Sequence, residues 1–363
     1  IAPIQPPEPP RRKQMGDVLD FDEIHIEFAP NLIAMVLDPA TGLDVRIANM
    51  RTHVASAFGL ILPEMRLTDE ANLLPGGYRI RLQGVERVQD RLMPDHVLVL
   101  LADGVATPDG VDVREPVYGA PARWVRTDRQ EEAAIAGLTV VSPAEVLATH
   151  LLEVIRANLA RLLSLRGLRR LLDEFVNLSD PARAEANRRL LDEMMPDKVP
   201  VDLLLMVLRL LLEERVSIRN LPLILESIAE SRGLGQPEAI CEHVRQRLGF
   251  QLVAELKRND GTIPLIQLAP EWEKTFASYQ IDAERGQRDV ALPPDQFSRL
   301  ANAIAERFNR AAEAGTYPAL VTSTLRRRFL RTVLGAKGLT QPVLSYEEIG
   351  MEARPAMVGI VPP

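Results

Sequence analysis

The chain has 363 residues, of which 46% are hydrophobic and 26% are charged, and this composition excludes a wholly disordered protein. Its 43 basic and 50 acidic side chains leave a formal net charge of −7, and only 4% of residues are aromatic, so no nucleic-acid partner is expected. At roughly 150 residues per domain, the length predicts two or three hydrophobic cores. Cys241 is the only cysteine, which excludes an intramolecular disulfide and favours a reducing compartment.

The N-terminal segment is typical of a linker. Residues 1–14 contain five prolines and a basic triplet, and the prolines occupy the place where a signal peptide needs an apolar core. We therefore expect residues 1–19 to extend from a preceding part of the protein. The most apolar stretch, residues 201–212, is too short and too charged to span a bilayer, so this piece is expected to be soluble.

The first third of the chain predicts strands and helices in alternation. Apolar residues form short runs or alternate with polar ones where strands are expected, and they recur at helical spacing elsewhere. Residues 103–123 contain repeated Asp-Gly pairs and prolines, so they are expected to form long loops or a small inserted domain. The predicted strands cover 25–28, 31–37, 78–83 and 97–101, and the predicted helices cover 47–58 and 129–136.

The middle of the chain predicts helices throughout. The stretch from Ser142 to Glu145 combines a capping serine, a proline at the first helical position and a glutamate at the third. After Asn259, strands alternate with helices again. Together these patterns predict an α/β fold of several subdomains, with α/β pieces at both ends and an all-helical middle. Helices are predicted after Ser142 and at 168–175, 181–194, 201–215, 220–230, 237–256, 294–314 and 324–334, and strands at 263–268, 319–321 and 341–345.

The sequence carries no signature of catalysis and no metal or cofactor motif. Phosphate-binding glycine loops, nucleophile elbows and metal-ligand spacings are absent from it. Cys241 is interpreted as a buried, inert thiol, and His25 with Glu27 as a surface pair. The basic residues of one C-terminal helix are interpreted as a solvated face, with a contact to a partner or a lipid surface as the alternative; they are Arg326, Arg327, Arg328 and Arg331.

One loop motif stands apart. Residues 115–119 read Glu-Pro-Val-Tyr-Gly and place an aromatic side chain between proline and glycine. From the residues alone, Tyr118 is either a small core plug, which is favoured, or a contact residue presented to a partner.

Two long stretches, residues 138–151 and 211–230, resemble the cytoplasmic domain of the FlhA family, the flagellar export gate of type III secretion. Residues 78–85 and 342–349 support the resemblance, which covers roughly residues 20–350. It implies a linker from a missing membrane part followed by four subdomains. The implied boundaries are 1–19 for the linker, 20–93 with 143–163 for the first α/β subdomain, 94–142 for the inserted second, 164–245 for the helical third, 246–350 for the α/β fourth, and 351–363 for a C-terminal tail.

The resemblance also implies a function. The chain would belong to a cytosolic ring, typically a nonamer, at the cytoplasmic face of the bacterial inner membrane. This ring would receive flagellar export chaperones with bound substrates for ordered export. It would meet other export-apparatus proteins, including the export ATPase complex, and would reach the membrane only through the missing N-terminal part. The resemblance implies recognition without catalysis, and neither a cofactor nor a metal.

In this family, chaperones bind a hydrophobic dimple formed by an acidic residue, proline, an aromatic residue and glycine, together with the threonine of an Ala-Thr-His-Leu stretch. Glutamate here replaces the commoner aspartate, and tyrosine replaces the commoner phenylalanine, so the hydroxyl needs water or a partner. On this resemblance, Tyr118 is a contact residue and no longer a plug. The matching chaperone-binding residues are Glu115, Pro116, Tyr118, Gly119 and Thr149.

The resemblance further implies that the linker docks on the first domain of a neighbouring subunit. The apolar candidates for this contact are Met15, Val18 and Leu19, and the alternative is that they pack loosely on their own domain.

Three other functions remain open at this stage. One is the export gate of an injectisome, which shares the fold and the ring. Another is an α/β enzyme of unknown substrate, against which the absence of catalytic motifs argues. The last is a structural ring without substrate contacts.

Overall fold

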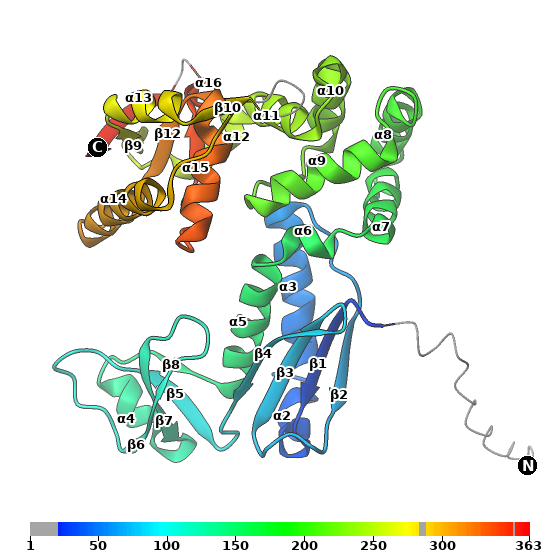
Figure 1. The fold of residues 1–363 in the computed structure, drawn as a ribbon. Helices are drawn as coiled ribbons and strands as arrows, with labels where there is room; N and C mark the ends of the chain where they lie inside the picture. The colour runs from blue at the N-terminus through cyan, green and yellow to red at the C-terminus, as the bar shows by residue number, and fades with distance from the viewer. Residues whose placement is uncertain (1–20, 283–287, 351–352) are drawn as a thin grey trace, which may run out of the picture. The chain divides into compact units, whose positions relative to one another are not determined.

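A computed structural model describes residues 21–282, 288–350 and 353–363, and the chain divides into two compact units between residues 171 and 172 (Figure 1). Met15, Val18 and Leu19 of the predicted linker lie outside the described residues. The mixed α/β class is confirmed, with several sheets and many helices. Within the described part of the chain, no helix combines the length and apolar character that a membrane span requires.

The N-terminal unit contains a four-stranded mixed sheet in the order β2-β1-β3-β4. The central strand β1 pairs in parallel with β2 and antiparallel with β3. The predicted alternation in β3 is confirmed, because Tyr78, Ile80 and Leu82 are fully buried while the residues between them are half-buried. The strands are β1 (Ile24–Phe28), β2 (Met65–Asp69), β3 (Gly77–Leu82) and β4 (Val85–Arg91).

The strand predicted at residues 31–37 is wrong. These residues form the short helical turns η1 (Pro30–Leu32) and α2 (Ile33–Val36). Pro30 stands at the start of the first turn, where its fixed φ favours a helix, and the position beside β1 is taken by β2. The apolar run therefore packs as helix although it is short enough to be a strand.

Two longer helices complete this part of the unit. α3 (Leu43–Phe58) and α5 (Pro143–Arg156) contact each other (Figure 1). The predicted capping box is confirmed, since Ser142 Oγ accepts the Glu145 N–H at 3.3 Å and the Glu145 carboxylate accepts the Ser142 N–H at 2.9 Å. This cap sets where α5 begins.

A second sheet in the same unit has the order β6-β7-β5-β8. The stretch predicted as loops or a small domain contributes two of its strands, β6 and β7, which pair antiparallel. Residues 115–119 are the connection between them. The elements are β5 (His96–Leu100), β6 (Gly110–Arg114), β7 (Pro121–Arg126), η2 (Thr127–Arg129), α4 (Gln130–Ile135) and β8 (Val140–Val141).

Helices fill the chain from residue 159 to residue 256, as predicted. The single helix predicted at 237–256 is divided in two at Leu248. Gly249, at the start of the second piece, lies so close to the Glu348 carbonyl that a Cβ there would be 2.3 Å from the oxygen. The helices are α6 (Leu159–Leu162), α7 (Leu165–Val176), α8 (Pro181–Met194), α9 (Val201–Glu213), α10 (Leu221–Ser231), η3 (Arg232–Leu234), α11 (Pro237–Arg247) and α12 (Gly249–Leu256).

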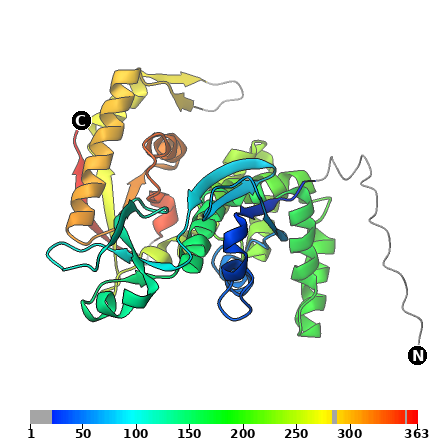
Figure 2. The ribbon, with the colours of Figure 1, turned by 90° about the horizontal axis from the view of Figure 1, so that it is seen from below.

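The C-terminal unit ends in a parallel sheet with the order β13-β12-β9-β14. Figure 2 shows β10 and β11 as a separate antiparallel hairpin, drawn in yellow. The elements are β9 (Thr262–Leu268), α13 (Glu271–Ser278), β10 (Gln280–Asp282), β11 (Arg288–Val290), α14 (Pro294–Glu313), β12 (Ala319–Thr322), α15 (Thr324–Ala336), β13 (Val343–Ser345), α16 (Tyr346–Ile349) and β14 (Arg354–Val361).

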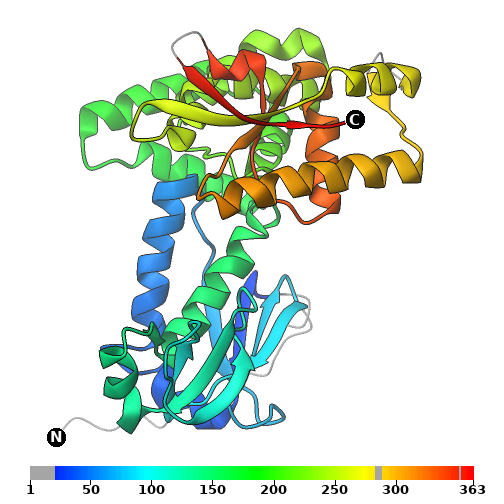
Figure 3. The same cartoon turned by 90° about the vertical axis from the view of Figure 1, so that its left-hand side faces the viewer.

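The expectation that residues 351–363 form a C-terminal tail is wrong for residues 354–361. These residues form β14, which lies along β9 at the edge of the sheet (Figure 3). The strand is recognised only through its partner, about 90 residues earlier in the chain, because its own sequence includes proline and glycine, which are depleted in strands.

Candidate functional site

The loop at residues 115–119 has a defined backbone although it lies outside the core. The Glu115 carboxylate accepts two backbone N–H groups, from Val117 at 2.7 Å and from Tyr118 at 2.7 Å. The Gly119 N–H donates to the Glu115 carbonyl at 2.9 Å, and Gly119 has a φ of 71°, in the region that favours glycine. Glu115 and Gly119 therefore close the turn that carries the aromatic residue.

Tyr118 is presented to solvent by this turn. Its side chain is 71% exposed, so it is not a core plug. Its hydroxyl donates a hydrogen bond to Glu153 Oε1 at 3.1 Å, which supplies the polar partner that a tyrosine in this position needs. Partial burial raises the pKa of the Tyr118 phenol, and the charge and hydrogen bond of Glu153 raise it further.

The other predicted site residues lie on the loop and on α5. Pro116 is half-buried in the loop, and Thr149 is exposed on α5, one helical turn before Glu153. Residues four apart on a helix share a face, so Thr149 and Glu153, whose carboxylate accepts the Tyr118 hydroxyl, lie on the same side of α5. Sequence reasoning missed Glu153, and this spacing from Thr149 is the signal that could have found it.

Thr149 also lines a pocket of about 280 Å³ between α3 and α5, two helices that Figure 3 shows alongside each other. Met50 is buried there, while Arg46 and Glu145 form an ion pair at 3.5 Å. The pocket thus combines apolar surface with charged and hydroxyl groups, a mixture typical of binding sites. It is lined by Arg46, Asn49, Met50, His53, Glu145, Ala148, Thr149 and Leu152.

The residue after Thr149 anchors α5 to the first sheet. His150 is buried, and its Nδ1 lies 2.7 Å from the hydroxyl oxygen of Tyr78 on β3. The two rings meet edge to face with centroids 5.8 Å apart. Burial lowers the pKa of His150 and raises that of Tyr78, so both side chains are neutral near pH 7.

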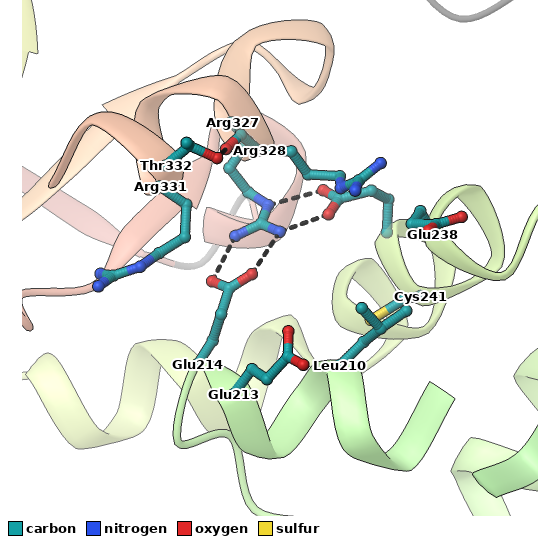
Figure 4. A pocket seen from close by; sticks show the side chains of 10 residues that line it. Leu210, Glu213, Glu214, Glu238, Cys241, Arg327, Arg328, Arg331 and Thr332 are labelled. Carbon is teal, nitrogen blue, oxygen red and sulfur yellow. Dashed lines mark hydrogen bonds and ion pairs between the residues drawn. The ribbon is translucent and has the colours of Figure 1, made fainter. Parts of the chain in front are cut away.

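The C-terminal unit contains a second polar cluster, which corrects the predicted solvated face. Arg327 is 1% exposed, and its guanidinium lies between two carboxylates (Figure 4). It donates to Glu214 at 2.7 and 2.8 Å and to Glu242 Oε2 at 2.6 Å. Arg326 is also buried and pairs with Glu273 at 2.7 Å, whereas Arg328 is exposed as predicted. The ion pairs offset part of the cost of burying these charges.

A pocket of about 240 Å³ adjoins this cluster. Cys241 lies in its wall, and burial raises the pKa of the thiol to about 12, in agreement with an inert cysteine. Burial, and then the neighbouring Glu214, raise the pKa of Glu213. The arginines and glutamates here join α9, α11 and α15, so this cluster holds the unit together.

The remaining predicted pair lies on the first sheet. His25 Nδ1 is 3.9 Å from Glu27 Oε1, but both side chains are half-buried, so they do not form the surface pair that was expected. Glu27 pairs more closely with Arg79, at 2.7 Å. Among residues that the structure describes, no group of three or more His, Cys, Asp or Glu side chains is arranged to hold a metal ion.

Comparison with known proteins gives consistent relationships. A sequence profile of the FHIPEP family matches residues 3–354. The flagellar biosynthesis protein FlhA of Caulobacter vibrioides is 34% identical over 364 residues, which cover 99% of this chain and 50% of that protein. The chain spans about half the length of the curated relatives it matches.

Solved structures share the fold. The CdsV protein of Chlamydia pneumoniae superimposes with a TM-score of 0.78 at 23% identity, covering 93% of this chain and 97% of that one. The nonameric SctV-C of EPEC superimposes with a TM-score of 0.72 at 16% identity, covering 94% of this chain and 98% of that one.

Proposed function

This chain belongs to the FHIPEP family, and from that premise we propose that it is a part of a flagellar type III export gate whose N-terminal unit docks chaperone–substrate complexes. The family match and the relatives named flagellar biosynthesis protein FlhA support the export-gate role and favour the flagellar over the injectisome system. The proposed activity is recognition on the cytoplasmic side of the membrane, without a chemical step.

The presentation of Tyr118 is the observation that carries the docking proposal. Interfaces draw much of their affinity from a few large side chains, and tyrosine is among the most frequent of these. Tyr118 is 71% exposed on a turn that Glu115 holds from within, so its ring is available without unfolding of the domain. At about 25 cal/mol per Å², burying ~150 Å² of ring contributes roughly 3–4 kcal/mol before ordering costs.

The surroundings of Tyr118 support a partner with an amphipathic segment. Such a segment would cover the exposed ring with apolar side chains. Along α5, Thr149 offers a hydroxyl, and the pocket beyond it has Met50 and Leu152 as apolar lining. A helix or extended segment lying across this surface would cover the ring of Tyr118 and place a side chain in the pocket.

We also propose that the chain forms a homo-oligomeric ring and meets further export-apparatus proteins, including the export ATPase complex. The nonameric state named for EPEC SctV-C supports the ring. In a ring, identical docking sites add avidity for a multivalent partner. Residues 1–19, with Met15, Val18 and Leu19, are proposed to dock on a neighbouring subunit. Deleting them should lower the sedimentation coefficient at a given concentration, and unchanged assembly would contradict the linker contact.

The docking proposal is tested by isothermal titration calorimetry with a purified flagellar chaperone–substrate complex. The native chain should bind with micromolar affinity, and Tyr118→Ala should weaken binding by at least about tenfold. Tyr317→Ala is the matched control, because Tyr317 is an equally exposed tyrosine at 76% and lies in the other unit. The control should bind as the native chain does.

Thermal melting of each variant separates docking from folding. Tyr118 is exposed, so its replacement should leave the melting temperature within about 2 °C of the native value. Native affinity in a folded Tyr118→Ala variant would contradict the site. Absence of binding by the native chain would contradict the docking function.

A further inference from the structure

Two side chains converge on one carboxylate oxygen beside the docking loop. Glu153 Oε1 accepts the Tyr118 hydroxyl at 3.1 Å and the Arg156 Nη1–H at 2.7 Å. Glu153 and Arg156 are three residues apart on α5, so they face the same way, and the Glu153 side chain is only 22% exposed. The carboxylate is thus held on the helix by Arg156 independently of its bond with the tyrosine.

The tyrosine needs such a partner because little else confines its ring. Its backbone is held by Glu115, but a side chain that is 71% exposed can rotate among staggered positions. Immobilising a mobile side chain on binding costs free energy, because the side chain loses rotational freedom. A hydrogen bond that restricts the ring beforehand removes part of this cost.

We propose that Glu153, supported by Arg156, is a positioning residue that holds the Tyr118 ring in the orientation in which it meets the docking partner. This inference rests on the docking function proposed above. It adds a residue that acts through Tyr118 and need not touch the partner itself. Glu115 positions the backbone of the turn, and Glu153 positions the side chain.

The electrostatics of the tyrosine agree with this geometry. After partial burial, the charge and hydrogen bond of Glu153 are the largest influences that raise the pKa of Tyr118, and Arg156 opposes them. A phenol that donates to a carboxylate resists ionisation, because the phenolate would lose the bond and face a like charge.

The first experiment tests the hydrogen bond between Tyr118 and Glu153 without a docking partner. The alkaline absorbance titration of the chain is recorded with and without the Tyr118→Phe substitution, and the difference isolates the ionisation of Tyr118. Glu153→Gln should lower this pKa, because the charge is removed. Glu132→Gln is the matched control, since Glu132 pairs with Arg129 at 2.9 Å with the same i,i+3 spacing but holds no tyrosine.

The second experiment is a double-mutant cycle on chaperone binding. Glu153→Ala should weaken binding by about threefold to tenfold, which lies within the range for the cost of ordering one mobile side chain on binding. Tyr118→Phe keeps the ring and loses the hydroxyl, so it should weaken binding to a similar extent. In the Tyr118→Phe background, Glu153→Ala should cause no further loss, and Glu132→Ala should be neutral in either background.

The outcomes separate the two proposals. Additive losses would show that Glu153 contacts the partner itself, and a neutral Glu153→Ala would show that it plays no part; either result overturns the positioning role. An unchanged Tyr118 titration in Glu153→Gln would overturn it as well. If the titration shifts as expected but the native chain binds no chaperone, the docking function fails while the Glu153–Tyr118 bond stands.

Discussion

Arg327 and Glu214 form a two-point ion pair inside the C-terminal unit. Nη1 of the guanidinium lies 2.7 Å from Glu214 Oε2, and Nη2 lies 2.8 Å from Glu214 Oε1. The pair joins α15 to the residue that follows α9, 113 positions earlier in the chain. Glu242 on α11 holds the remaining side of the same guanidinium. Three helices of this unit therefore meet at one buried cation.

The first prediction follows from this arrangement. Replacing Arg327 with methionine should lower the free energy of unfolding by about 3–5 kcal/mol, because the largely buried carboxylates of Glu214 and Glu242 lose this cation. Glu214 keeps the longer ion pair with Arg245, at 3.4 Å. Urea unfolding followed by circular dichroism measures the change. Arg328→Met, at the exposed neighbour, should cost less than about 0.5 kcal/mol. A similarly small effect at both positions would contradict the role of Arg327 in joining α9, α11 and α15.

The helical core gives a second prediction. Leu211 on α9 and Ile224 on α10 are fully buried, so truncation of either to alanine should cost about 2–5 kcal/mol of unfolding free energy. Met206 lies on the same helix as Leu211 but is 47% exposed, which makes Met206→Ala the control. The same denaturation experiment applies. Losses below about 1 kcal/mol at the two buried positions would contradict the packing.

Glu115 supports a third prediction, on the turn at residues 115–119. Glu115→Ala removes the acceptor of the Val117 and Tyr118 N–H groups, so these two amides should exchange with solvent faster. Hydrogen exchange followed by NMR measures the rates. The turn lies outside the core, so the whole chain should lose no more than about 1–2 kcal/mol of stability. Unchanged exchange at both amides would show that the carboxylate does not hold the turn.

His150 gives a prediction on pH. Burial lowers its pKa in the folded chain below the ordinary value of 6.5, so the unfolded chain takes up the proton first as the pH falls. Stability from this group is complete above about pH 6.5 and is lost as the pH falls towards the folded pKa, by at most about 1.4 kcal/mol per pH unit.

The test compares urea unfolding of the native chain and His150→Gln between about pH 7 and pH 5. The native chain should lose more stability over this range than the variant. His53→Gln, at an exposed histidine, should keep the native dependence. Parallel curves for the native chain and His150→Gln would contradict the assignment.

Local signals in the sequence were enough for many of the elements. The capping residues Ser142 and Glu145 predicted where α5 begins, because both partners of a capping box lie within four residues. The alternation from Tyr78 to Leu82 predicted a half-buried strand for the same reason, since a strand repeats every two residues. The resemblance likewise came from contiguous motifs, and the family match confirms it.

Long-range contacts decided what these signals could not. The arginine-rich face of α15 has the local pattern of a solvated surface, yet Arg327 finds its carboxylates 85 and 113 positions away. The partner of the Tyr118 hydroxyl is 35 positions away, on another element.

The sequence by itself thus determined the family, most helices and strands, and the residue types of the turn at residues 115–119. Only the tertiary structure decided which charges are buried, that the last residues complete a sheet, and which side chain holds Tyr118. The physical reason is that caps and periodicity arise from neighbours in the chain, whereas burial and ion pairing depend on residues that folding brings together.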